Sequence, residues 1–238
     1  MTDFEYHHSK KHNEPVQRLN SYLEKAMGTY KDGKRNGLWT FYLIEYGSLE
    51  PRLYKTETFV EGEKTGEFKY YFSSGEKGIE GQYLKGKYNG PVRSYYRGGE
   101  KYGLRIYKEG KATGKHVYYF LDGSMRMVIF FLNDKAHGPQ KTFYESGVLK
   151  EEYTNKNGKT NGVYRFYYPS GNLWVEKIYK EDLLVNVTQL LDDQGNSLEI
   201  GTFKNGSGRL NFYNKSGEIY AVKTYQNGRR IKTEKIKR

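Results

Sequence analysis

The 238 residues are enough for one or two ordinary domains, and they include 25 tyrosines, 28 glycines and no cysteine. The lack of cysteine excludes disulfide scaffolds, cysteine-based zinc sites and thiol catalysis, and an aromatic content of 16% argues against disorder. The formal net charge of +12 indicates either a soluble, self-repelling surface or an acidic partner such as nucleic acid, anionic lipid or an acidic protein.

The N-terminal 29 residues carry no recognisable targeting segment. Residues 1–12 are polar and rich in histidine, and no window of the chain approaches the ~18 apolar residues of a membrane span. For a complete chain we therefore expect a cytoplasmic protein. Asn13 and Pro15 form a helix-start signal, and the apolar residues from Val16 to Met27 share one helical face. We predict a lead and a capping helix within 1–29, the helix at 14–27.

From Tyr30 onward two columns of glycines repeat with a period of 24 residues. The first column occupies the second turn of each unit, with Asn186 in the same position of the seventh unit: Gly37, Gly66, Gly90, Gly114, Gly138, Gly162. The second column occupies the turn between the two strands of a unit: Gly75, Gly99, Gly123, Gly147, Gly171, Gly195, Gly217. Two independent columns with one period indicate a repeat architecture, and glycine or asparagine at these places suits a positive φ.

Each unit contains two aromatic-rich strands joined by a short turn, which predicts a β-hairpin. Successive hairpins joined by short turns pair antiparallel. We therefore predict an all-β fold, an elongated single-layer antiparallel β-meander of about eight ~24-residue hairpin repeats over 30–228. A basic C-terminal tail follows at 229–238. The first unit has an insertion within 43–54, either a functional loop or a tolerated surface excursion, and the seventh unit is the most degenerate.

One face of the predicted sheet carries a row of tyrosines beside a row of basic residues. The tyrosines stand five residues after the second-turn glycine and suit a structural stacking stripe: Tyr71, Tyr95, Tyr119, Tyr167. The basic residues stand two positions earlier: Lys69, Arg93, Lys141, Arg165. They either line a groove for an acidic, extended partner such as nucleic acid or cover the aromatic row with their stems. These eight residues are our candidate binding face.

The segment Met125–Leu132 differs from the other strands because it is apolar on both faces. It is either the buried middle of the array or a patch for a partner.

No pattern in the chain points to catalysis. No histidine pair has zinc-ligand spacing with a third partner, and His116 and His137 occupy non-equivalent positions of the repeat. The Gly-x-Gly matches lack the strand–helix context of phosphate binding, and the acids are dispersed. We therefore expect a protein that is not an enzyme, with no catalytic residue, no metal site and no cofactor.

The unit Tyr-x-x-Gly-x-x-x-Gly-x-x-x-x-Tyr-Tyr-x-x-Gly-x-Leu resembles the MORN repeat variant, arrays of which are found in the bacterial YwqK-family antitoxin proteins. The resemblance covers about 30–228. In the repeat at 157–179 the motif residues are in place: Gly162, Tyr167, Tyr168, Gly171, Leu173. Asp134 and Asp182 replace the expected glycine of the first turn.

This resemblance implies an elongated antiparallel meander and a non-enzymatic, antitoxin- or immunity-like protein. Its extended surface would bind a protein partner, either a toxin-like protein or a second copy of the chain. The charge and the basic tail support an alternative, a scaffold that binds an anionic surface, acidic lipid or nucleic acid, through its basic face.

Overall fold

The computed structural model describes residues 2–7, 22–45, 50–214 and 217–236. It divides the chain into two compact units, unit 1 with residues 1–113 and 121–123, and unit 2 with residues 114–120 and 124–238. All regular elements in the described ranges are β-strands, so the prediction of an all-β fold is confirmed there.

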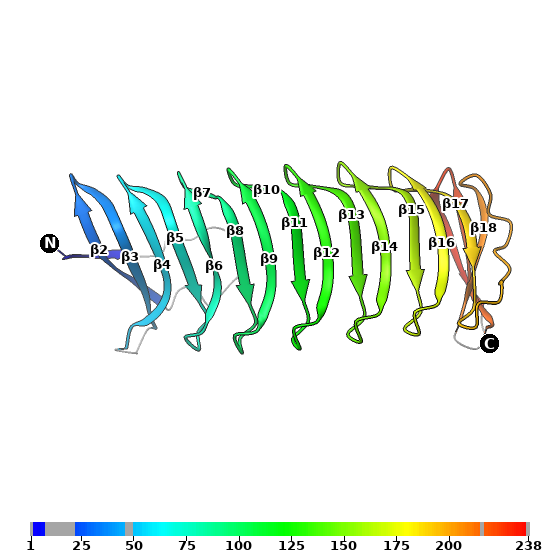
Figure 1. Cartoon of the computed structure of the whole chain (residues 1–238), viewed down its shortest axis with the longest axis horizontal. Coiled ribbons are helices and arrows are strands. Elements are labelled where there is room, and N and C mark those ends of the chain that lie inside the picture. The colour runs from blue at the N-terminus through cyan, green and yellow to red at the C-terminus, as the bar shows by residue number, and fades with distance from the viewer. Residues whose placement is uncertain (1, 8–21, 46–49, 215–216, 237–238) are drawn as a thin grey trace. The chain divides into compact units, whose positions relative to one another are not determined.

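Unit 1 is an antiparallel sheet in which neighbouring hairpin strands pair in chain order (Figure 1). Two short strands, β7 and β10, continue the pairing of β6 and β9 around the turns. The strands of unit 1 are β1 (Thr2–His7), β2 (Tyr22–Lys31), β3 (Lys34–Glu45), β4 (Arg52–Val60), β5 (Glu63–Tyr71), β6 (Lys77–Leu84), β7 (Lys87–Tyr88), β8 (Gly90–Tyr95), β9 (Lys101–Lys108) and β10 (Lys111–Ala112).

Unit 2 continues the hairpin pattern from β11 to β17 and then adds a separate three-stranded sheet, β18–β20. Its strands are β11 (Gly114–Tyr119), β12 (Met125–Leu132), β13 (Lys135–Phe143), β14 (Leu149–Lys156), β15 (Lys159–Tyr167), β16 (Leu173–Lys180), β17 (Leu183–Leu190), β18 (Gly208–Tyr213), β19 (Ile219–Gln226) and β20 (Arg229–Lys235).

The second glycine column lies in the turns between strands, as predicted, whereas the glycines of the first column, predicted in a turn, lie within or at the start of strands. Every glycine in both columns has a positive φ, for example 82° at Gly162 and 96° at Gly171. Asp182 replaces a glycine and still adopts a φ of 69°, and its carboxylate accepts the N–H of Thr160 at 2.7 Å. The prediction of a positive φ for Asn186, which lies within β17, is wrong, because this residue does not adopt one.

The predicted helix at 14–27 is wrong where the structure describes it, and its first part, 14–21, lies outside the described residues. Residues 22–27 belong to β2, which pairs with β1 on one side and β3 on the other. Ala26 is fully buried, and a Cβ added at Gly28 would lie 2.3 Å from the Trp39 ring. Backbone pairing on both edges and close packing of Trp39 therefore override the helical spacing of the apolar residues.

The prediction of one continuous meander is wrong at its C-terminal end. After β17 the chain keeps the turn around Gly195, but residues 191–207 make only isolated bridges. A buried cluster then joins residues of both sheets: Val175, Leu184, Val187, Leu190, Phe203, Leu210. Residues 229–235, within the segment predicted as a tail, form β20. Unit 2 therefore ends with two sheets that share a hydrophobic core.

Four of the most buried side chains stand two residues after a glycine of the first column. In unit 1 they are Trp39, Phe68 and Val92, with exposures of 0%, 1% and 0%, and in unit 2 His116, with 2%. This column lies on the opposite face from the tyrosine row, because successive strand residues alternate between faces. The segment Met125–Leu132 is half-buried along β12 with exposed ends, so it is not the fully buried centre of a core.

Residues 46–49 of the predicted insertion lie outside the described residues. The residues of the insertion before this gap lengthen β3, and those after it include the start of β4.

Candidate binding face

In unit 2 the predicted basic row forms part of a ladder in which basic and acidic residues alternate. The strand register pairs Lys141 with Glu152, Glu152 with Arg165, and Arg165 with Glu176. Each hairpin therefore contributes a base from one strand and an acid from the other. We call these four residues the charge ladder.

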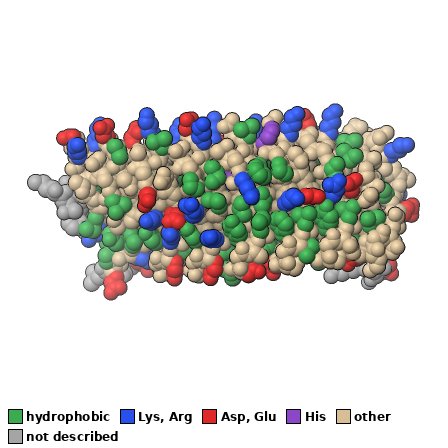
Figure 2. Space-filling view, viewed as in Figure 1, with side chains coloured by type: hydrophobic (Ala, Val, Ile, Leu, Met, Phe, Trp, Pro, Cys, Tyr) green, Lys and Arg blue, Asp and Glu red, His purple; other side chains and the backbone are tan. Residues whose placement is uncertain are grey.

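The members of the charge ladder are bonded to one another. Lys141 Nζ lies 3.1 Å from Glu152 Oε2, and Arg165 Nε donates to Glu176 Oε2 at 2.8 Å. Arg165 also reaches Glu152 at 3.6 Å, and the Tyr167 hydroxyl donates to Glu152 at 2.9 Å. Figure 2 shows one face of the molecule, on which acidic and basic side chains lie side by side in places with hydrophobic side chains around them. The predicted proximity of the basic and tyrosine rows is therefore confirmed for Arg165 and Tyr167.

Unit 1 repeats the arrangement. Lys69 pairs with Glu80 and Glu80 with Arg93 across the strands. The Tyr95 hydroxyl donates to Glu80, and Lys77 donates to the same carboxylate at 2.9 Å. Lys69 itself lies 3.7 Å from Glu67 on its own strand.

These contacts shift the protonation of the tyrosines and acids. Burial and the hydrogen bond to Glu152 raise the pKa of Tyr167 to about 12. Burial opposes ionisation of Glu152, but the hydrogen bonds from Tyr167 and Lys141 outweigh it and lower the pKa of this carboxyl. The charge ladder is thus ionised and largely self-compensated at neutral pH. Because Lys141 and Arg165 have side-chain exposures of 48% and 40%, each ion pair contributes only a modest stabilisation.

The tyrosines of the predicted row share one position in the strand pairing. The row tyrosines are half-buried, and each follows a register shift near the end of its strand: Tyr71, Tyr95, Tyr119, Tyr167. The extra residue of the bulge lies on the partner strand, for example Trp174 opposite the step from Phe166 to Tyr167. The bulge therefore recurs with the repeat.

The acids of the charge ladder were missed by sequence reasoning, which took the acids as dispersed. A signal was present, because Glu152 and Glu176 are 24 residues apart and Glu80 lies 72 residues, three periods, before Glu152. Equivalent acids on the second strand of three hairpins, Glu80, Glu152 and Glu176, face the basic row, and Leu104 and Val128 hold this position in the two hairpins between. Alignment of these acids by the repeat period, as was done for the bases, would have identified them.

The opposite face carries buried polar groups that sequence reasoning also missed. Glu57, only 1% exposed, accepts hydrogen bonds from Lys64 at 2.7 Å and Tyr70 at 2.8 Å. In unit 2 Tyr164 donates to Glu151 at 2.5 Å. These groups are satisfied by their neighbours and give this face a structural role.

The described residues contain no group of three or more histidines and acids that could hold a metal ion. His116 is buried and stacks on Phe131, with ring centroids 4.6 Å apart. His137 Nδ1 accepts the N–H of Asn157 at 3.5 Å near a turn. Neither histidine is therefore placed as a free general base over an open cleft.

The geometry of β13–β16 agrees with a known repeat family. Residues 136–157 and 160–181 match the MORN repeat variant. The two matched segments cover the hairpins that carry the charge ladder, so the MORN part of the predicted resemblance is confirmed for them. MORN repeats generally mediate binding to proteins or membrane lipids. No curated protein matches the sequence.

Proposed function

We propose that the protein is a non-enzymatic repeat protein that binds a protein partner through the face of the charge ladder. The observation that carries the proposal is the pairing of Lys141 and Arg165 with Glu152 and Glu176. The bases and acids of the charge ladder neutralise one another beside half-buried tyrosines. The face therefore has alternating charges without a strong excess of positive charge. Complementary charge patterns confer specificity, and tyrosine and arginine are enriched at protein interfaces.

The finer part of the proposal is an antitoxin- or immunity-like role in a bacterial cytoplasm, with a toxin-like protein or a second copy of the chain as partner. It is supported by the resemblance of the repeat to those of the YwqK-family antitoxins. No helix in the described part of the chain is long and apolar enough to cross a membrane.

The first experiment compares Arg165→Glu with a control at Lys159, which lies on the same strand and has a side-chain exposure of 53%. Arg165→Glu reverses the charge between two acids and should weaken binding of a co-purified partner by about tenfold or more. Lys159→Glu should leave the affinity unchanged. Affinity is measured by calorimetry with the partner identified from native-host co-purification. Failure to recover a stoichiometric protein, or equal affinity in both variants, contradicts the proposal.

The antitoxin role is tested separately by co-expression with the protein encoded by the neighbouring gene. If that protein arrests growth, the wild-type chain should restore growth and Arg165→Glu should not. If the wild-type chain does not relieve the growth arrest, the antitoxin role is contradicted. Partner binding is then still decided by the first experiment.

A second candidate function, binding to an anionic surface, is favoured by the net charge of +12. If this function is correct, the protein should bind vesicles containing phosphatidylserine, or duplex DNA, with an affinity that falls steeply as the salt concentration rises. Replacing both Glu152 and Glu176 by glutamine frees Lys141 and Arg165 from their acids and should strengthen such binding. Absence of binding at low salt by the wild-type chain rules out this function.

A further inference from the structure

A pocket of about 310 Å³ lies in unit 2 beside the junction of its two sheets. Its apolar and aromatic wall comes from β15–β18: Tyr164, Phe166, Trp174, Leu190, Leu210, Phe212. The pocket exists because the strand pattern breaks after β17 and the separate sheet β18–β20 faces the last hairpin. A regular continuation of the meander would not create this hollow.

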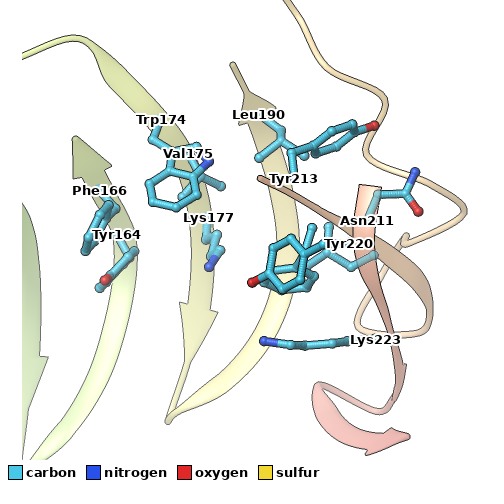
Figure 3. Close-up of a pocket in the computed structure, with 12 residues that line it drawn as sticks. Tyr164, Phe166, Trp174, Val175, Lys177, Leu190, Asn211, Tyr213, Tyr220 and Lys223 are labelled. Carbon is cyan, nitrogen blue, oxygen red and sulfur yellow. The ribbon is translucent and has the colours of Figure 1, made fainter. Parts of the chain in front are cut away.

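Two lysines extend into the pocket, Lys177 from β16 and Lys223 from β19 (Figure 3). Lys177 is half-buried, and its Nζ lies 5.7 Å from the centroid of the Tyr164 ring. Lys223 Nζ lies 3.8 Å from the centroid of Phe212. Among the described residues, no carboxylate lines the pocket and neither lysine forms an ion pair.

The two ammonium groups make the empty pocket electrostatically unfavourable. Burial, together with the charge of Lys223, lowers the pKa of Lys177 to about 8. Burial and Arg230 lower the pKa of Lys223 as well. A desolvated cation without a counter-charge loses hydration, and a contact with an aromatic ring returns only part of that loss. An anion placed between the two lysines would relieve both the desolvation and the repulsion.

We infer that this pocket binds a small amphiphilic carboxylate. The carboxylate would lie between Lys177 and Lys223, and an aromatic or branched apolar body would pack against Trp174 and Phe166. The volume lies at the lower end of the range typical of small-molecule sites, which are mostly apolar with a few convergent polar groups. The lysines select the negative charge, and the aromatic wall selects against ions without an apolar body, such as inorganic phosphate.

The probe for this site is 2-naphthoate, titrated into the full chain by calorimetry near pH 7. We expect one saturable site per chain with a dissociation constant below about 1 mM. Acetate supplies the charge alone and 2-naphthalenemethanol the apolar body alone, so each should bind at least about tenfold more weakly. The proposal is overturned if naphthoate does not saturate the protein or if the alcohol binds equally well.

Matched variants locate the binding. Lys177→Met and Lys223→Met should each weaken naphthoate binding by about tenfold or more, whereas Lys177→Arg should retain most of it. Lys180→Met is the control, because Lys180 is exposed on the same strand and does not line the pocket. Equal affinity of the wild-type chain and the folded Lys177→Met protein contradicts the proposal.

A proton-linkage measurement tests the site without any variant. The other titratable groups that line the pocket are Tyr164, Tyr213, Tyr220 and Lys223. Burial and Glu151 raise the pKa of Tyr164, which therefore stays protonated. An anion beside Lys177 should raise its pKa, so binding near pH 8 should take up a fraction of a proton and binding near pH 6 none. Calorimetry in buffers of different ionisation enthalpy gives the number of protons taken up on binding. Equal proton uptake at pH 6 and pH 8 contradicts the assignment.

Discussion

Among the lysines of unit 2, Lys177 has the environment that differs most from that of a surface lysine. Its pKa falls from the ordinary 10.5 to about 8 because the fold buries it and places Lys223 nearby. Below pH 8 both the folded and the unfolded chain carry the charge, and the folded state bears the full cost of burying it. Between about pH 8 and 10.5 the folded chain loses the proton first, so stability rises with pH through this window.

We predict that Lys177→Met raises the urea midpoint near pH 7 and reduces the rise in stability between pH 7 and 9. Methionine fills a similar volume without the charge, and it suits the aromatic wall. Lys223, whose pKa is also lowered, is still present in the variant, so a smaller rise in stability with pH should remain. The measurement is urea unfolding at several pH values, with the exposed Lys180→Met as control. A wild-type midpoint that does not rise over this range would contradict the prediction.

At the scale of the element, the hairpins and their turns could be predicted from the sequence because glycine spacing reports backbone conformation directly. The shared face of Arg165 and Tyr167 also followed from alternation along a strand. What failed depended on contacts distant in sequence. The apolar spacing of 14–27 contains no information about the partners of β2, and the degenerate seventh unit does not show that β18–β20 will form a second sheet. The two-lysine pocket could not be predicted for the same reason.

The register shift at Gly162, within β15, offers a test of how much backbone conformation alone contributes to a hairpin. Its φ is 82°, and a Cβ added there would meet no atom within 4 Å. We predict that Gly162→Ala lowers the free energy of unfolding by about 1–2 kcal/mol and Gly162→Asn by less, because asparagine tolerates a positive φ better. Thermal and urea unfolding measure both, with exposed Lys159→Ala as control. A greater loss for asparagine than for alanine would show that side-chain contacts dominate at this position.

At the scale of the whole molecule, each unit contains a cluster of buried hydrophobic residues among those described. One cluster in unit 1 contains Ala26, Trp39, Phe41 and Phe59, and the other in unit 2 contains Leu184, Leu190 and Leu210. Hairpins that pair with their neighbours in chain order make mainly local contacts. In such repeat proteins stability is approximately the sum of the units and their nearest-neighbour interfaces. Damage to one cluster should therefore remain local.

We predict that Leu210→Ala, which removes a side chain only 2% exposed, destabilises its cluster by about 2–5 kcal/mol. Amide hydrogen exchange should then lose protection in β16–β20, while β2–β5 keep theirs. Phe41→Ala should give the reverse pattern, with loss in β2–β5 and retention in β16–β20, and so serves as the matched control. Exchange followed by mass spectrometry resolves these segments. If either variant lowers protection equally in both sets of strands, the chain unfolds as one cooperative body, and the additive description of its repeats is wrong.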